Sequence, residues 1–150
     1  MERCKLVTRV IFLLNITKIG ANAFPWANNL VVVDIPEGIE SIGEEAFKRC
    51  TSLTTVFFST TLILIGEYAF FECYSLDNID LLHTNLQKLG EAAFWACRAL
   101  QSMTIPDSLQ TFGRAVFSDC SKLVPFCVNV SSPFNDTTSN VVAHLRSLQN

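Results

Sequence analysis

The sequence predicts a single α/β solenoid, in which short parallel strands from successive copies of one repeat stack into a sheet. The dipeptide Ala-Phe, or Val-Phe in the last copy, recurs five times, and its phenylalanines are 23, 23, 24 and 23 residues apart. A glycine lies four residues before each of these phenylalanines, and a cysteine lies three residues after all but the first. Because a 23-residue unit cannot enclose a core alone, successive copies must bury their apolar faces against one another.

The first element expected in each repeat is a short strand. In the second copy Leu30, Val33 and Ile35 are its apolar positions, and Pro36 ends it because proline cannot donate to a strand ladder. A second short extended segment follows, from residue 39 to Gly43. The glycine suits either a turn with positive φ or a close approach of two backbones.

The third element expected is a short helical turn over residues 44–50, on the side of the solenoid away from the strands. Glu44 and Glu45 are acids in its first turn, where they favour the positive end of a helix dipole. Ala46, Phe47 and Cys50 have the i, i+3 and i+4 spacings that place side chains on one face. The phenylalanine column is therefore expected to form an aromatic stack in the core.

The cysteines fill a second core column, which we interpret as a ladder of small, reduced, buried thiols. The column comprises Cys4, Cys50, Cys73, Cys97 and Cys120. Zinc sites use pairs of cysteines only a few residues apart, so a spacing of 23 residues does not favour a metal site. The two histidines, His83 and His144, lie in an insertion loop and in the C-terminal tail. We expect no catalytic residue, no metal and no cofactor, and an enzyme is the remote alternative.

Composition excludes several other classes of protein. Apolar residues make up 49% of the 150 residues and charged residues 17%, which is the opposite of a disordered chain. A net charge of −3 without a cluster of Lys or Arg argues against a nucleic-acid partner. The longest apolar run, residues 10–14, is too short to span a membrane.

The outward-facing strand positions are the candidate binding surface. Alternation along the strands places Asp34, Phe57 and Asp80 on adjacent rungs, with Thr55 and Asn78 in the neighbouring column. An exposed aromatic ring between two acids is a candidate binding site for a basic protein partner, and the alternative is a variable surface with no ligand. On the last strand, Cys127 lies between two inward positions, so it is expected to point outward as a candidate reactive thiol.

The repeat unit resembles the BspA-like leucine-rich repeat, whose signature is Ile-Gly, Ala-Phe, a following Cys and Ile-Pro at 23-residue spacing. The resemblance covers residues 4 to about 130 and implies a right-handed leucine-rich-repeat solenoid. Such repeats are modules of surface adhesion and host-interaction proteins, and the family has no shared catalytic site to carry over. This chain departs from the signature at Phe58-Ser59, at Leu81-Leu82 and at the missing cysteine of the first copy.

The domain organisation follows from where the repeat columns end. Residues 1–130 are expected to form the solenoid, with five full copies plus a partial first and last, and Val7, Val10 and Phe12 continue its columns. Residues 131–150 are expected to be a polar linker and a C-terminal capping helix, with apolar residues at helical spacing from residue 141 to 148. The N-terminal coil has no such cap, so we expect a fragment of a longer array, or end-to-end association through this coil.

The function expected is a non-enzymatic scaffold for protein interaction or adhesion. The alternative is a purely structural fragment of a larger leucine-rich-repeat surface protein. The N-terminus lacks a signal-peptide pattern, which favours the cytoplasm, with a fragment of a secreted or cell-surface protein as the alternative.

Overall fold

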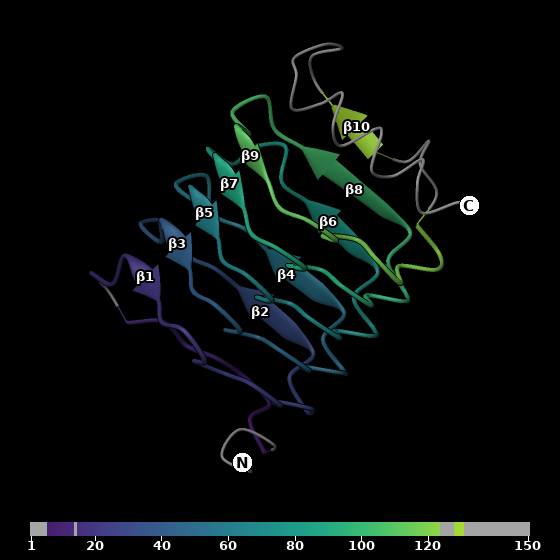
Figure 1. The fold of residues 1–150 in the computed structure, drawn as a ribbon. Helices are drawn as coiled ribbons and strands as arrows, with labels where there is room; N and C mark the ends of the chain where they lie inside the picture. Colours follow the sequence, from purple (N-terminus) through teal and green to yellow (C-terminus); the bar gives the residue numbers. More distant parts are fainter. Residues whose placement is uncertain (1–5, 14, 124–127, 131–150) are drawn as a thin grey trace.

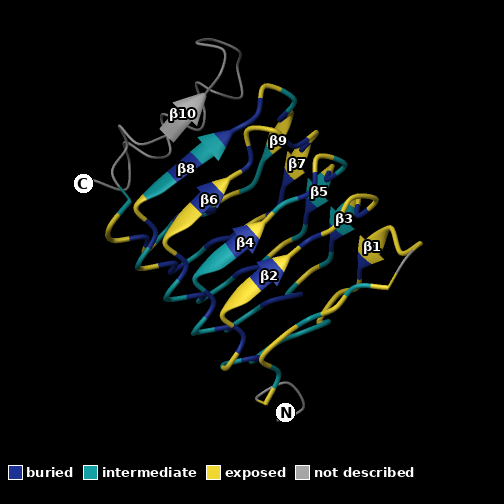
Figure 2. Ribbon diagram, turned by 180° about the vertical axis from the view of Figure 1, so that it is seen from behind, coloured by how far each residue is buried: buried dark blue, intermediate teal, exposed yellow. Residues whose placement is uncertain are grey.

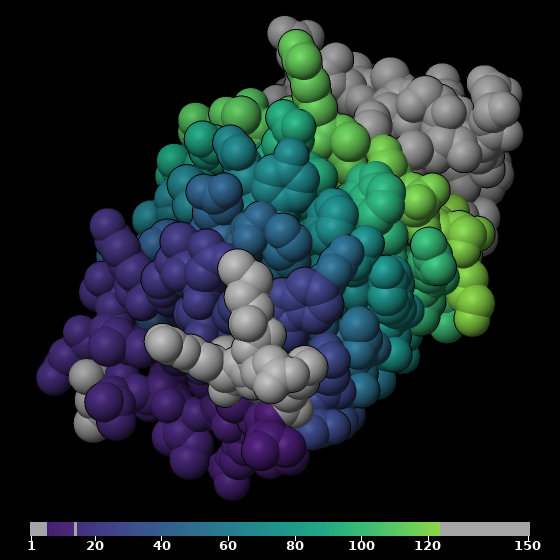
Figure 3. Space-filling model, turned by 60° about the horizontal axis from the view of Figure 1, so that its bottom comes forward, coloured from purple at the N-terminus to yellow at the C-terminus, as the bar shows by residue number. Residues whose placement is uncertain are grey.

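The chain winds into coils that stack along one axis from the N-terminus to the C-terminus (Figure 1). This computed structural model describes residues 6–13 and 15–123, together with the backbone of residues 128–130. Each full coil contributes a two-residue strand to one row and a longer strand to a second row. In the space-filling view, the N-terminal coil forms one end of the molecule and later coils follow in chain order (Figure 3).

The two-residue strands form one five-stranded parallel sheet in the order β1-β3-β5-β7-β9. Its strands are β1 (Lys18–Ile19), β3 (Ser41–Ile42), β5 (Leu64–Ile65), β7 (Lys88–Leu89) and β9 (Thr111–Phe112). The register aligns the second residue of every strand in one column, and this column faces the core from β1 to β7. The predicted parallel stacking of copies is therefore confirmed in this row.

The longer strands form the second row, which is a two-stranded sheet followed by a three-stranded one. The pair is β2 (Val32–Asp34) and β4 (Thr55–Phe57), and the triplet is β6 (Asn78–Asp80), β8 (Ser102–Ile105) and β10 (Val128–Val130). Between the sheets, the Asp77 N–H donates to the Thr54 carbonyl at 3.3 Å. In β2, β4 and β6 the central residue is buried and the residues beside it face outward (Figure 2).

The prediction of helical turns is wrong, since the described residues contain no helix. Over residues 43–50, the N–H groups of Glu45, Phe47 and Arg49 donate to carbonyls of the next coil at 2.7–3.0 Å. Glu45 and Arg49 have φ of 55° and 60°, which turns these donors along the solenoid axis. An α-helix would direct the same donors to carbonyls four residues back. Hydrogen bonding between coils therefore replaces the local helix that the acids and the side-chain spacing favour.

The predicted core columns are confirmed. Neighbouring rings of the phenylalanine column, Phe24, Phe47, Phe70, Phe94 and Phe117, stack with centroids 5.2–5.8 Å apart. The four cysteines of the ladder in the described residues are buried thiols. Each Sγ donates to the carbonyl of a phenylalanine in the preceding coil at 3.2–3.4 Å. The ladder thus both fills space and satisfies a buried carbonyl.

Two of the three departures from the repeat signature are accommodated by local hydrogen bonds. Ser59, which takes the place of a proline, is buried and donates from its hydroxyl to the Ile39 carbonyl at 3.0 Å. In the 24-residue copy, the buried Thr84 hydroxyl donates to the Leu81 carbonyl at 2.8 Å. Because these polar groups are satisfied, the coil stack continues through both sites.

The two ends of the solenoid differ from the expectation. The register pairs Met103 with Val128, whereas the 23-residue columns place Phe126 there. The chain between these paired positions is therefore two residues longer than one repeat. At the other end, Val10 and Phe12 pack against the core as the columns predict, but residues 6–13 form no strand. Cys4, Cys127 and the expected linker and capping helix at 131–150 lie outside the described residues.

Candidate functional site

The outward face of the longer strands carries the residues that the sequence singles out. Asp34, Phe57, Asn78 and Asp80 are exposed there, and Thr55 is half-buried. The buried residue at the centre of each strand anchors it to the core, so the residues on either side must face outward. Asp34 pairs with Phe57 in the register, which places them on adjacent rungs.

The side chains of Asp80 and Asn78 accept hydrogen bonds from residues of the next strand, β8. The Thr104 hydroxyl donates to the Asp80 carboxylate at 2.5 Å, and the Ser102 hydroxyl donates to the Asn78 side-chain oxygen at 2.8 Å. The bond from Thr104 lowers the pKa of Asp80, and the Leu82 N–H and the nearby His83 act in the same direction. These two side chains join β6 to β8. They are therefore less available to a partner than the sequence suggests.

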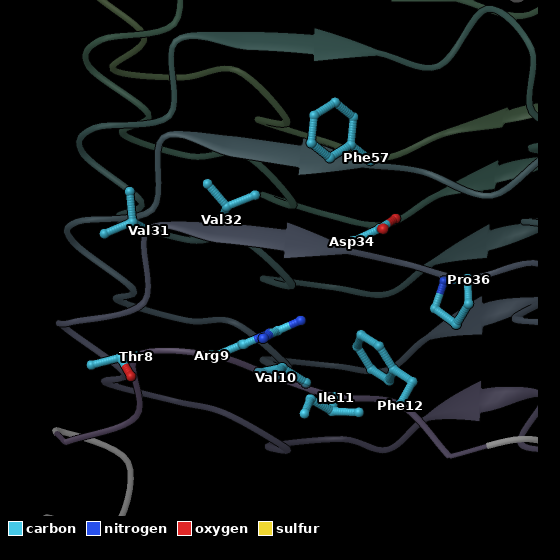
Figure 4. Close-up of a pocket in the computed structure, with 10 residues that line it drawn as sticks. All are labelled: Thr8, Arg9, Val10, Ile11, Phe12, Val31, Val32, Asp34, Pro36 and Phe57. Atoms are coloured by element: carbon cyan, nitrogen blue, oxygen red, sulfur yellow. The ribbon is translucent and has the colours of Figure 1, made fainter.

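A groove of about 590 Å³ lies at the N-terminal end of this face, between residues 8–12 and β2 (Figure 4). Of the five candidate residues on the strand face, the groove brings together Asp34 and Phe57 and leaves out Thr55, Asn78 and Asp80. Its walls also include Arg9 and Ile11 from the N-terminal segment and Val32 from β2.

The groove is strongly apolar for an exposed surface. Ile11 is 74% exposed, Val32 is 46% exposed and Phe57 is 58% exposed. Among the described residues, the Asp34 carboxylate has no hydrogen-bond or ion-pair partner. Exposed apolar patches with polar rims mark interaction sites on soluble domains. This end of the strand face is thus the best-formed candidate site.

One sequence signal could have located the groove. In the strand that begins the second copy, residues 31 and 32 are both valine. The corresponding pairs in the next copies are Thr54-Thr55, Asp77-Asn78 and Gln101-Ser102, all polar. Outward valines at positions that other copies fill with polar residues indicate a site specific to this coil.

A smaller hollow of about 140 Å³ lies on the other side of Phe57. Its lining includes Phe58 and Asp80 from the strand region and His83 from the insertion loop. Phe57 therefore lines two depressions of the strand face.

The turns that follow the repeat glycines carry a ladder of aromatic and charged side chains that the sequence pattern did not reveal. The Arg49 guanidinium lies 4.4 Å from the Trp26 ring centroid and pairs with the Glu72 carboxylate. Trp95 stacks on Phe71 with centroids 4.6 Å apart. Because these rings and charges contact one another, the ladder stabilises neighbouring coils and offers less to a partner than the groove does.

Other kinds of site have no counterpart in the part of the chain that the structure describes. Those residues contain no group of three or more His, Cys, Asp or Glu side chains able to hold a metal ion. They also contain no helix long and apolar enough to cross a membrane.

The regularity of these coils is matched by a family model for the BspA type leucine rich repeat region, which fits six copies over residues 2–131. The chain belongs to this repeat family. The resemblance inferred from Ile-Gly, Ala-Phe and the following Cys is therefore confirmed. A comparison with curated proteins found no match.

Solved structures of bacterial leucine-rich repeat proteins share this fold. The chain is 31% identical to a leucine-rich repeat protein of T. pallidum, with a TM-score of 0.70 over 73% of this chain and 50% of that one. It is 27% identical to a leucine rich cell surface protein of Faecalibacterium prausnitzii, with a TM-score of 0.72 over 87% of this chain and 33% of that one. A Bacteroides ovatus leucine-rich repeat protein, 24% identical with a TM-score of 0.62 over 71% of this chain and 27% of that one, shows the fold alone. This chain thus spans half or less of each of these proteins, and none of their descriptions names a reaction.

Proposed function

We propose that this chain is a protein-interaction module that binds its partner at the N-terminal end of the strand face. The observation that carries the proposal is the exposed apolar groove formed by Ile11, Val32 and Phe57. Arg9 and Asp34 supply charge at its rim. A large aromatic side chain beside a hollow, with polar groups around it, is the usual anchor of a protein interface. Membership of a repeat family and similarity to a bacterial cell surface protein support this assignment.

The test compares the proteins captured from the native source by the wild-type chain, by Phe57→Ser and by Ile63→Ser. Ile63 is also exposed but does not line the groove, so its substitution controls for the loss of an apolar surface residue. We expect the partner to bind the wild type and Ile63→Ser, and to bind Phe57→Ser at least about 30-fold more weakly. Equal capture by all three, with unchanged thermal melts, would contradict the proposal.

The alternative is a purely structural segment whose binding surface lies elsewhere in a longer protein. The greater length of the solved relatives favours it. Under this alternative, we expect Phe57→Ser and Ile63→Ser to capture the same proteins. The same capture experiment therefore separates the two functions.

End-to-end association through the N-terminal coil is a second candidate. An apolar cavity of about 230 Å³ lies at this end, and its lining includes Phe12, Leu13 and Phe24. Leu13 is 76% exposed, so a second copy would bury it. We expect sedimentation analysis to show a concentration-dependent dimer that Leu13→Glu abolishes, and a wild type that stays monomeric would contradict this candidate.

A further inference from the structure

The groove exposes one edge of β2 as well as apolar side chains. The Ile35 N–H donates to the Phe57 carbonyl at 2.9 Å, and the Val31 carbonyl accepts from the Thr54 N–H at 2.9 Å. These groups therefore point toward β4. Because backbone groups alternate in direction along a parallel strand, those of Val32 and Asp34 point the other way, toward residues 8–12.

Nothing in the described residues pairs with this edge. No backbone hydrogen bond joins residues 6–13 to β2, although the repeat columns place Val10 beside Val33. Strands β4 and β8 differ from β2, because the corresponding edge of each is paired with the preceding strand of its sheet. That strand is β2 for β4 and β6 for β8. An unpaired strand edge is a template for another extended chain.

We propose that an extended segment of a partner protein adds to this edge of β2 as a parallel strand, within the groove. The inference rests on the proposed function and names the class of ligand for the same site. A groove of about 590 Å³ is within the range of ligand sites. In this binding mode, backbone hydrogen bonds supply affinity and the alternate side chains supply specificity.

The charges at the groove define the segment further. Figure 4 shows Arg9 across the groove from Val32, with Asp34 farther along β2 in the chain direction. No ion pair joins Arg9 to Asp34 among the described residues. A partner segment that runs parallel to β2 therefore fits best with an acidic residue opposite Val32, near Arg9, and a basic residue opposite Asp34. The central residue between them is apolar and faces inward. The central residue would donate its N–H to the Val32 carbonyl and accept from the Asp34 N–H.

The probe is the peptide Thr-Glu-Val-Lys-Val-Thr, acetylated and amidated at its ends. The first control peptide carries an N-methyl group on the valine between Glu and Lys, which removes that donor while keeping every side chain. The second exchanges Glu and Lys. On the protein, Val32→Pro removes one N–H of the edge, and proline is tolerated where that N–H faces outward from an edge strand.

Binding and amide exchange are measured by NMR on the full chain. We expect saturating peptide to slow exchange of the Val32 and Asp34 amides and to leave the Ile35 amide, already bonded to β4, unchanged. The N-methyl peptide and the Val32→Pro protein should each bind about tenfold more weakly, the effect of one or two lost hydrogen bonds. The charge-exchanged peptide should also bind more weakly, and the thermal melt of Val32→Pro should match the wild type.

Three results would overturn this inference. The first is no binding of the peptide to the wild type, and the second is equal binding of the N-methyl peptide. The third is slow exchange of the Val32 and Asp34 amides in the isolated protein, because residues 8–12 would then occupy the edge themselves.

Capture of the native partner separates this inference from the proposed function. Loss of the partner by both Phe57→Ser and Val32→Pro supports both proposals. Loss by Phe57→Ser alone overturns strand addition and leaves the strand face as a binding surface. Retention by both variants overturns both proposals.

Discussion

Two positions in each coil hold a residue other than glycine in the left-handed region of the backbone. They lie two and six residues after the repeat glycine, and their φ values are 49–64°. An L-residue in this conformation costs roughly 1–2 kcal/mol. In the four coils that begin at Gly20, Gly43, Gly66 and Gly90, each of these residues donates its N–H to the next coil, as Ala92 does to the Arg114 carbonyl at 2.8 Å. Hydrogen bonds between coils therefore offset local backbone strain.

Adjacent alanines allow a test of this strain. Ala92 has φ of 49°, whereas Ala93 has no positive φ, and both are buried. We expect Ala92→Gly to raise the free energy of unfolding by about 0.5–1 kcal/mol, because glycine adopts this conformation freely. Ala93→Gly should lower it by about 1 kcal/mol. Urea denaturation measures both, and a loss of stability in Ala92→Gly would contradict the strain argument.

The buried thiols make stability depend on pH at the alkaline end. Burial raises the pKa of the Cys73 and Cys97 thiols well above the ordinary value of 9.0. In the unfolded chain the thiols lose their protons above pH 9, while in the folded chain they keep them. The unfolded state is then favoured as the pH rises, so stability present below pH 9 is lost above it.

We expect the free energy of unfolding to fall between pH 9 and 10, by at most about 1.4 kcal/mol for each of the two thiols. The variant with Cys73→Ala and Cys97→Ala should lose this part of the slope and keep whatever the tyrosines contribute. Urea denaturation at a series of pH values provides the measurement. Identical slopes for the variant and the wild type would show that the thiols do not titrate on unfolding.

At the scale of the element, the repeat glycine is required by the close approach of one turn to the turn below it. Gly90 has no positive φ, but a Cβ added to it would lie 2.5 Å from the backbone of Gly66 and Glu67. Gly20 has no atom within 4 Å of such a Cβ. Of the two explanations that the sequence leaves open for this glycine, the structure selects the close approach.

Alanine substitutions at these two glycines should therefore differ sharply. We expect Gly90→Ala to lower the free energy of unfolding by about 1–3 kcal/mol, because the coils must move apart. Gly20→Ala should change it by less than about 0.5 kcal/mol. Thermal denaturation followed by circular dichroism checks the pair, and similar melting of both variants would rule out this role for the glycine.

At the scale of the whole molecule, the phenylalanine stack runs the length of the solenoid and couples each coil to its neighbours. Phe70 is fully buried and stacks at 5.2 Å on the ring in each adjacent coil, Phe47 and Phe94. Phe24, near the N-terminal end, is half-buried and stacks on one ring, and among the described residues the aromatic contact on its other side is the edge contact of Phe12. Stability in a solenoid is a sum of such contacts between neighbours, so it varies along the axis.

Phe70→Ala is expected to lower the free energy of unfolding by about 3–5 kcal/mol, and Phe24→Ala by about half as much. Chemical denaturation of the two variants measures this difference. If Phe24→Ala proved the more damaging, the N-terminal end would contribute more to the stability of the array than its packing indicates.

The sequence alone determines which residues share each column of the solenoid. The period of 23 residues places Phe47 next to Phe70 and Cys73 next to Cys50 in space, and the structure confirms both columns. It also predicts the inward position of Val56 and the outward position of Phe57, because strand alternation allows no other arrangement once the core column is known. The family follows from the same columns.

Only the tertiary structure decides what the coils do to one another. Residues 44–50 have a local preference for helix, but hydrogen bonds to the next coil turn Glu45 and Arg49 into left-handed positions instead. The period likewise places Val10 beside Val33, yet the N-terminal segment stays apart from β2 and opens the groove. A repeat period specifies which positions face one another, whereas the separation of two coils and their backbone pairing depend on contacts that form only when the coils stack.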